Sequence, residues 1–144
     1  MAILLPITLT SAGAAALINC WLAIRAGQSR GAIGGGLGDG GNARVLARSR
    51  SHANFTEYTP FILILIGLIE LAEGSSLWLW TASALYFAAR LLHPFGMDGV
   101  IKQGRVISTL VSLLALLVLG VYAISLPYRT QPLPQGLEAP VARG

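Results

Sequence analysis

Long apolar segments alternate with short polar connections along this sequence, and the alternation predicts membrane-spanning helices. Four segments are mainly apolar, over residues 2–24, 43–71, 76–95 and 106–126. A helix of about 20 apolar residues crosses the roughly 30 Å hydrocarbon core of a bilayer. We therefore predict an all-α integral membrane protein in which residues 1–126 form one domain, a bundle of four transmembrane helices.

The ends of these segments carry further signals. The second segment is longer than a membrane requires, so its first turns should project beyond the lipid, and Pro60 should kink it. We expect Pro127 to end the fourth helix and the polar, proline-rich tail 127–144 to be disordered. The first segment could instead be a signal peptide, but no basic region precedes it and it exceeds the roughly 7–15 apolar residues of such peptides.

The connection between the first two segments contains eight glycines over residues 27–41. It superficially resembles a phosphate-binding loop, but no strand precedes it, so we interpret it as a flexible connector. The connection over 72–75 is very short, which makes the second and third helices antiparallel neighbours.

The composition supports a membrane protein and excludes other classes. Apolar residues make up 54% of the 144 residues and charged residues only 11%, against roughly 25% charged in soluble domains. A net charge of +4 could indicate nucleic-acid binding, but the basic residues cluster beside the apolar segments, as in membrane proteins. We therefore expect contact with membrane lipid and no nucleic-acid partner. The single Cys20 excludes an internal disulfide and a multi-cysteine metal site, and we expect no metal.

Lysine and arginine are distributed unequally between the two ends of the predicted bundle. One end carries Arg25, Arg30, Arg44, Arg48, Arg50, Arg90, Lys102 and Arg105. The other end carries only Arg129 and Arg143. Because basic connections stay in the cytoplasm, we expect the first and third connections to be cytoplasmic and both termini to lie outside.

A row of polar side chains at the start of the second apolar run marks a candidate site. Arg50, Asn54 and Glu57 are spaced i, i+4 and i+7, which places them on one face of a helix. Charges at the centre of a membrane helix cost about 2.5–3.5 kcal/mol each on insertion scales, so such a row usually has a function. On the third helix, Tyr86, Arg90, His93 and Met97 form a second stripe.

Several arginines around one carboxylate suit a small anionic ligand that also carries an amine. Glutathione, with two carboxylates, one ammonium and a thiol, has this chemistry. The alternatives are structural: arginines at helix ends often extend to lipid headgroups, Arg50 and Glu57 could form an ion pair between helices, and His93 could cap a helix end.

Residues 50–61 closely resemble the second-helix signature of the MAPEG family (membrane-associated proteins in eicosanoid and glutathione metabolism), which includes microsomal glutathione transferases and leukotriene C4 synthase. The signature residues are Arg50, His52, Asn54, Glu57, Tyr58, Pro60 and Phe61. Residues 86–96 look like the family's third helix, the positions of Arg25 and Arg105 agree with it, and residues 37–42 are similar to bacterial members.

The resemblance implies a homotrimer of four-helix subunits in a bacterial inner membrane, with glutathione bound between subunits. Carried onto matching positions, the glutathione site would consist of Arg25, Arg50, His52, Asn54, Glu57, Tyr58, Arg90 and His93. Arg105 would be catalytic, because a guanidinium beside the sulfur stabilises the thiolate. The expected activity is that of a glutathione transferase or peroxidase, with a lipophilic electrophile from the bilayer as the second substrate.

One departure leaves a second function open. Several catalytic members of the family have a tyrosine one turn beyond the position of His93, where this chain has Met97. The family also includes a member that binds lipid without chemistry of its own, so the alternative is a non-catalytic scaffold that binds glutathione or lipid. A small four-helix exporter is a third possibility, but the first segment carries no carboxylate for proton coupling.

Overall fold

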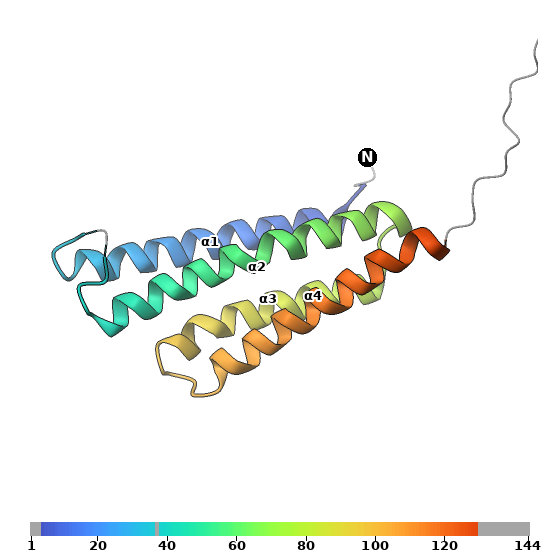
Figure 1. Cartoon of the computed structure of the whole chain (residues 1–144). Helices are drawn as coiled ribbons and strands as arrows, with labels where there is room; N and C mark the ends of the chain where they lie inside the picture. Colours follow the sequence, from blue (N-terminus) through green and yellow to red (C-terminus); the bar gives the residue numbers. More distant parts are fainter. Residues whose placement is uncertain (1–3, 37, 130–144) are drawn as a thin grey trace, which may run out of the picture.

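The computed structural model describes residues 4–36 and 38–129, and within them the chain folds into four helices and no strands. They are α1 (Pro6–Gly31), α2 (Ala43–Glu73), α3 (Leu77–Met97) and α4 (Gly104–Arg129) (Figure 1). The predicted all-α four-helix bundle is confirmed. Helices α1, α2 and α4 are each long and apolar enough to cross a membrane. Helix α3 has 21 residues and carries the polar Arg90 and His93 in its second half.

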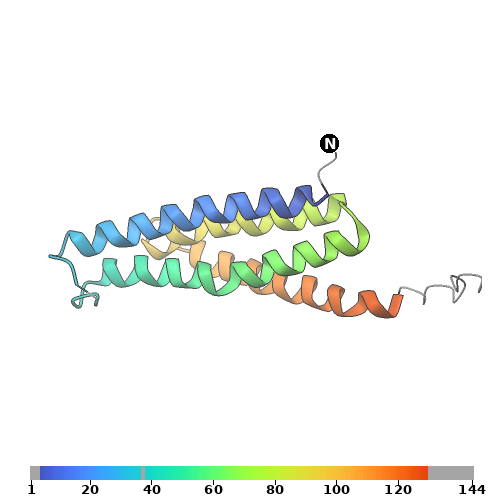
Figure 2. The same ribbon diagram turned by 90° about the horizontal axis from the view of Figure 1, so that it is seen from above.

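The helices are arranged as two antiparallel hairpins, α1–α2 and α3–α4, and each hairpin is closely packed within itself. The hairpins lie side by side near the 74–76 connection and diverge toward the other end of the bundle (Figures 1 and 2). That diverging end holds the 32–42 and 98–103 connections, and most of the basic residues lie at this end, chiefly in the helices beside them. The ribbons of the two hairpins are therefore furthest apart at the basic end (Figures 1 and 2).

Side chains facing the centre of the bundle hold the hairpins together. The buried core includes Ile7, Ile18, Leu22, Phe55, Ile62, Ile66, Ile69, Leu79, Tyr86 and Leu119. Hydrogen bonds between helices join Ser11 to Ser83 at 2.6 Å and Thr59 to Tyr86 at 2.9 Å. In lipid the hydrophobic effect does not drive helices together, so they associate through close packing and such interhelical hydrogen bonds.

The outward faces of the helices are apolar. Large exposed side chains include Leu9, Leu17, Ile64, Leu68, Leu85, Leu110, Leu114, Leu117 and Val121. A soluble monomer rarely exposes continuous apolar surface on this scale, whereas a lipid environment favours it. The exposed faces and the long apolar helices together define an integral membrane protein in contact with lipid.

The first turn of α1 is capped from another helix. Its own flanking residue Leu5 offers no capping side chain, and Pro6 occupies the first helical position. Instead the carboxylate of Glu70 on α2 accepts hydrogen bonds from the backbone N–H groups of Ile7 and Thr8 at 2.9 and 2.8 Å. A carboxylate satisfies unpaired N–H groups and is favoured by the dipole at a helix N-terminus. This contact ties the start of α1 to the end of α2.

The structure also fixes the helix ends. Helix α2 begins where it was expected, because the side chain of Asn42 accepts hydrogen bonds from the N–H groups of Arg44 and Val45. The expectation that Pro127 ends the fourth helix is wrong, since α4 continues to Arg129. A proline removes one backbone hydrogen bond and its ring crowds the carbonyl of residue i−4, but membrane helices tolerate this, so a helix can extend beyond it. Most of the tail that we expected to be disordered, residues 130–144, lies outside the described residues.

Candidate functional site

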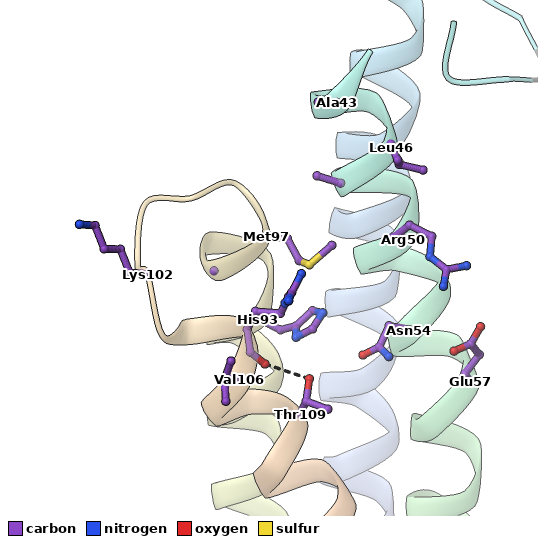
Figure 3. A pocket seen from close by; sticks show the side chains of 13 residues that line it. Ala43, Leu46, Arg50, Asn54, Glu57, His93, Met97, Lys102, Val106 and Thr109 are labelled. Carbon is purple, nitrogen blue, oxygen red and sulfur yellow. Dashed lines mark hydrogen bonds between the residues drawn. The ribbon is translucent and has the colours of Figure 1, made fainter. Parts of the chain in front are cut away.

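A pocket of about 670 Å³ opens between α2 on one side and α3 and α4 on the other, at the end where the hairpins diverge (Figure 3). It is lined by Ala43, Leu46, Ala47, Arg50, Asn54, Glu57, His93, Gly96, Met97, Lys102, Arg105, Val106 and Thr109. This volume suits a small peptide or a drug-sized ligand, for which pockets of about 300–1,000 Å³ are usual.

Helix α2 supplies the polar wall of the pocket. The helical spacing of Arg50, Asn54 and Glu57 brings all three onto it, as their sequence pattern predicts. Figure 3 shows Asn54 facing His93 across the pocket, while Arg50 and Glu57 extend toward its outer side from the same helix. Arg50 and Glu57 are exposed, so both charged groups are accessible to a ligand.

Helices α3 and α4 supply the opposite wall. His93 is buried, and its Nδ1 atom has no hydrogen-bond partner in the part of the chain that the structure describes. Met97 lies one turn further along α3, and Arg105 stands in the first turn of α4. The Thr109 hydroxyl donates to the backbone carbonyl of Arg105 at 2.9 Å. This wall combines one unpartnered imidazole nitrogen, one thioether and one guanidinium.

Arg90 lies behind the pocket and does not line it. The residue is 1% exposed, and its guanidinium donates to Asn54 Oδ1 at 2.9 Å and to Ser112 Oγ at 3.2 Å. It also lies 5.6 Å from the ring of Phe55 and 5.9 Å from that of Tyr58, distances at which a cation is attracted to an aromatic face. Because Arg90 occupies the carbonyl oxygen of Asn54, the amide N–H₂ of Asn54 is left to face the pocket.

Arg25 lies away from the pocket of its own chain. It forms an ion pair with Asp98, just beyond the end of α3, and its guanidinium lies 5.4 Å from the Trp21 ring. Arg48 approaches the same carboxylate, with 3.8 Å between Nε and Oδ1. These contacts link α1 and α2 to the end of α3.

His52 and Tyr58 also lie outside the pocket lining. His52 Nε2 is 3.0 Å from Asn19 Oδ1 on α1, and Tyr58 lies against Arg90. Of the predicted site residues, one chain therefore gathers Arg50, Asn54, Glu57, His93 and Arg105 around the pocket. The other four, Arg25, His52, Tyr58 and Arg90, contact neighbouring helices instead.

The pocket carries more positive than negative charge. Arg50, Lys102 and Arg105 line it together with a single acid, Glu57. Within residues 4–36 and 38–129 the ion pairs are those of Asp98 with Arg25 and Arg48, so none of these four charges is neutralised by an ion pair there. An Arg50–Glu57 ion pair, the structural alternative, is not formed. The same ranges contain no cluster of three His, Cys, Asp or Glu that could hold a metal.

Sequence reasoning missed several residues. Lys102 and Thr109 are not among the site residues predicted from the sequence, yet both line the pocket. Asp98 was overlooked although it directly follows the predicted Met97 stripe and is one of the few acids at the basic end. An acid among arginines is a usable signal for an ion pair, and it would have indicated a partner for Arg25.

The fold and the pocket together define a class of protein, a four-helix integral membrane protein with a polar pocket between its helices. Comparison with family models makes the assignment specific: the model of the MAPEG family matches residues 8–125, and the chain belongs to this family. No curated protein and no solved structure gives a significant match. The chain is therefore a membrane protein of a family linked to glutathione and eicosanoid metabolism.

Proposed function

We propose that the pocket binds glutathione and activates its thiol against a lipophilic electrophile. The observation that carries this proposal is the match of charges. Three cations and one acid line the pocket, and glutathione in its thiolate form has three anionic groups and one ammonium. Membership of the MAPEG family supports the same ligand.

The positions of the side chains suggest their roles. Arg50 and Lys102 would hold the two carboxylates, and Glu57 would hold the ammonium. Asn54, oriented by Arg90, would donate its amide N–H₂ to the peptide backbone. Arg105, across the pocket from Asn54 and Glu57, would stabilise the thiolate.

In the homotrimer that the resemblance implies, glutathione lies between subunits. His52 contacts Asn19 within the α1–α2 hairpin, and Arg25 contacts Asp98 just beyond the end of α3. They would therefore reach a glutathione molecule only in the pocket of a neighbouring subunit. Tyr58, beside Arg90, would support Asn54 from within the same chain.

The chemistry follows from the thiolate. Its sulfur attacks the electrophilic carbon, a sulfur–carbon bond forms, and the leaving group departs with the bonding electron pair; in an addition, the displaced pair takes a proton from water. With a lipid hydroperoxide, the sulfur would attack the terminal oxygen and break the oxygen–oxygen bond, and the alkoxide released would take a proton from water and leave as an alcohol. The resulting sulfenic acid would then condense with a second glutathione to give the disulfide and water. Leu46 and Val106 give the pocket an exposed apolar rim through which a bilayer-soluble substrate can enter.

The test is a glutathione titration of the purified protein in detergent, with thiolate absorbance and conjugation of a chromogenic electrophile as readouts. We expect Glu57→Gln to weaken binding by about 2 kcal/mol, roughly thirtyfold, because a charged hydrogen bond is lost. We expect Arg105→Ala to keep binding but to lose the thiolate signal. Glu73→Gln and Arg129→Ala are matched controls, since they alter the same residue types at the opposite ends of α2 and α4.

Two results would overturn the proposal. One is a wild-type protein that does not bind glutathione. The other is a loss of binding or thiolate in the control variants as large as in Glu57→Gln and Arg105→Ala, because such a loss would reflect general damage rather than a site.

A non-catalytic binding function is the second candidate, and Met97 is the observation that favours it. Its thioether lines the pocket, where it can neither donate nor accept a strong hydrogen bond. This function predicts glutathione binding without turnover in the wild type. Met97→Tyr would then gain conjugation because it adds a hydroxyl beside the thiol, whereas the matched control Met97→Phe would not. Turnover by the wild type would exclude this candidate.

A further inference from the structure

The backbones of helices α3 and α4 lie close together where two glycines, Gly96 and Gly104, meet. A Cβ atom on Gly96 would lie 2.1 Å from the backbone nitrogen of Arg105 and 2.6 Å from the carbonyl carbon of Gly104. Conversely, a Cβ on Gly104 would lie 3.2 Å from Cα of Gly96 and 3.3 Å from the carbonyl oxygen of Leu92. Only glycine permits the backbones to come so close.

Backbone hydrogen bonds hold the connection between the two helices in place. The N–H groups of Val100 and Ile101 both donate to the carbonyl of Phe95, at 3.0 and 3.3 Å. The N–H of Gly104 donates to the carbonyl of Ile101 at 3.0 Å. The two glycines thus lie in backbone contact beside a hydrogen-bonded connection, at the residue where α4 begins.

Arg105 is the next residue after this contact, and its side chain lines the pocket. Gly96 lines the same pocket between His93 and Arg105. We propose that Gly96 is a positioning residue, which sets the distance of Arg105 from the α2 wall and so from the ligand sulfur. The part of this inference that concerns the sulfur rests on the proposed function.

Any side chain at position 96 must push α4 away. The gap from the new Cβ to Arg105 N has to grow from 2.1 Å to at least the 3.4 Å of an ordinary contact, a shift of more than 1 Å. The atom in the way is backbone, which cannot rotate aside. Misplacement of a catalytic group by about 1 Å can cost about a hundredfold in rate. Asn54 and Glu57, on the opposite wall, keep their positions.

The first measurement uses glutathione as the probe and compares thiolate formation as a function of pH with affinity. Gly96→Ala should retain most of the glutathione affinity but shift thiolate formation to higher pH and lower kcat by about a hundredfold. Gly104→Ala, whose contact is milder, should show a smaller effect of the same kind. Gly120→Ala, also on α4, is the control, because a Cβ at this position would meet no atom within 4 Å. A Gly96→Ala protein with the wild-type thiolate profile would overturn the inference.

The second measurement does not depend on glutathione. Spin labels at Ala47→Cys and Val106→Cys, in a Cys20→Ser background, report the width of the pocket from its two walls. Gly96→Ala should change this distance relative to Gly120→Ala, because the new Cβ overlaps the backbone at the start of α4. An unchanged distance between the labels would refute the positioning role of Gly96. A wild-type protein that binds no glutathione would instead refute the proposed function and leave the positioning role to be judged by this distance.

Discussion

Glu70 and Arg90 are both buried charged residues, but their surroundings give them different roles. Glu70 is 1% exposed and accepts four hydrogen bonds, from the N–H groups of Ile7 and Thr8 and from the hydroxyls of Thr8 and Ser75. Three of these bonds hold α1 and the fourth holds the connection after α2, a structural use that argues against the proton-coupling role that an exporter would need. Arg90 instead bonds neutral groups and orients Asn54 at the pocket.

Substitution of Glu70 tests its capping role. Glu70→Ala leaves the first N–H groups of α1 without partners, and hydrogen bonds to charged groups are worth about 1.5–3 kcal/mol each, so we expect a loss of roughly 3 kcal/mol in the free energy of unfolding. Glu70→Gln should lose less, because its amide oxygen still accepts. Unfolding in mixed detergent micelles provides the measurement.

Glu73→Ala is the control for Glu70→Ala, since Glu73 is an exposed acid one turn away that contacts Tyr122 rather than α1. A Glu70→Ala protein as stable as Glu73→Ala would show that the cap contributes nothing measurable.

At the level of the helices, sequence pattern was sufficient for several properties that belong to one helix. The start of α2 follows from Asn42, and the shared face of Arg50, Asn54 and Glu57 follows from the helical repeat. The predicted end of α4 was wrong, because a proline weakens a helix without determining where the helix stops.

Properties that depend on two helices were harder to predict. Arg25 was assigned to the site from its place at a helix end, yet within one chain it pairs with Asp98. Whether an arginine turns inward or toward a neighbouring helix depends on packing angles that no single helix encodes. The close contact of Gly96 and Gly104 has the same origin: neither glycine is distinctive in its own helix, and the contact exists only in the pair.

The whole molecule is polar at one end. The diverging ends of the hairpins hold the pocket and most of the basic residues, while the converging ends hold the Glu70 cap. A strongly basic end is the one that stays in the cytoplasm, so the pocket should open to the compartment in which glutathione is abundant in the cell. Orientation and ligand supply are thus consistent with each other.

Accessibility of cysteines tests this orientation. In a Cys20→Ser background, Gln103→Cys lies in the 98–103 connection and Ala72→Cys lies at the opposite end of the bundle, and both positions are exposed. A membrane-impermeant thiol reagent added to intact cells should label Ala72→Cys only, and added to inverted vesicles it should label Gln103→Cys only. The reverse pattern would place the pocket outside the cytoplasm.

The glycine-rich connection between α1 and α2 is a suitable site for an insertion. Gly34 and Gly35 are exposed with positive φ, and a Cβ on either would meet no atom within 4 Å. Lengthening such a connection adds little closure entropy, since each doubling costs only about 0.6 kcal/mol. An epitope or a small rigid domain inserted there would enlarge the particle for cryo-electron microscopy while leaving the helices that form the pocket intact.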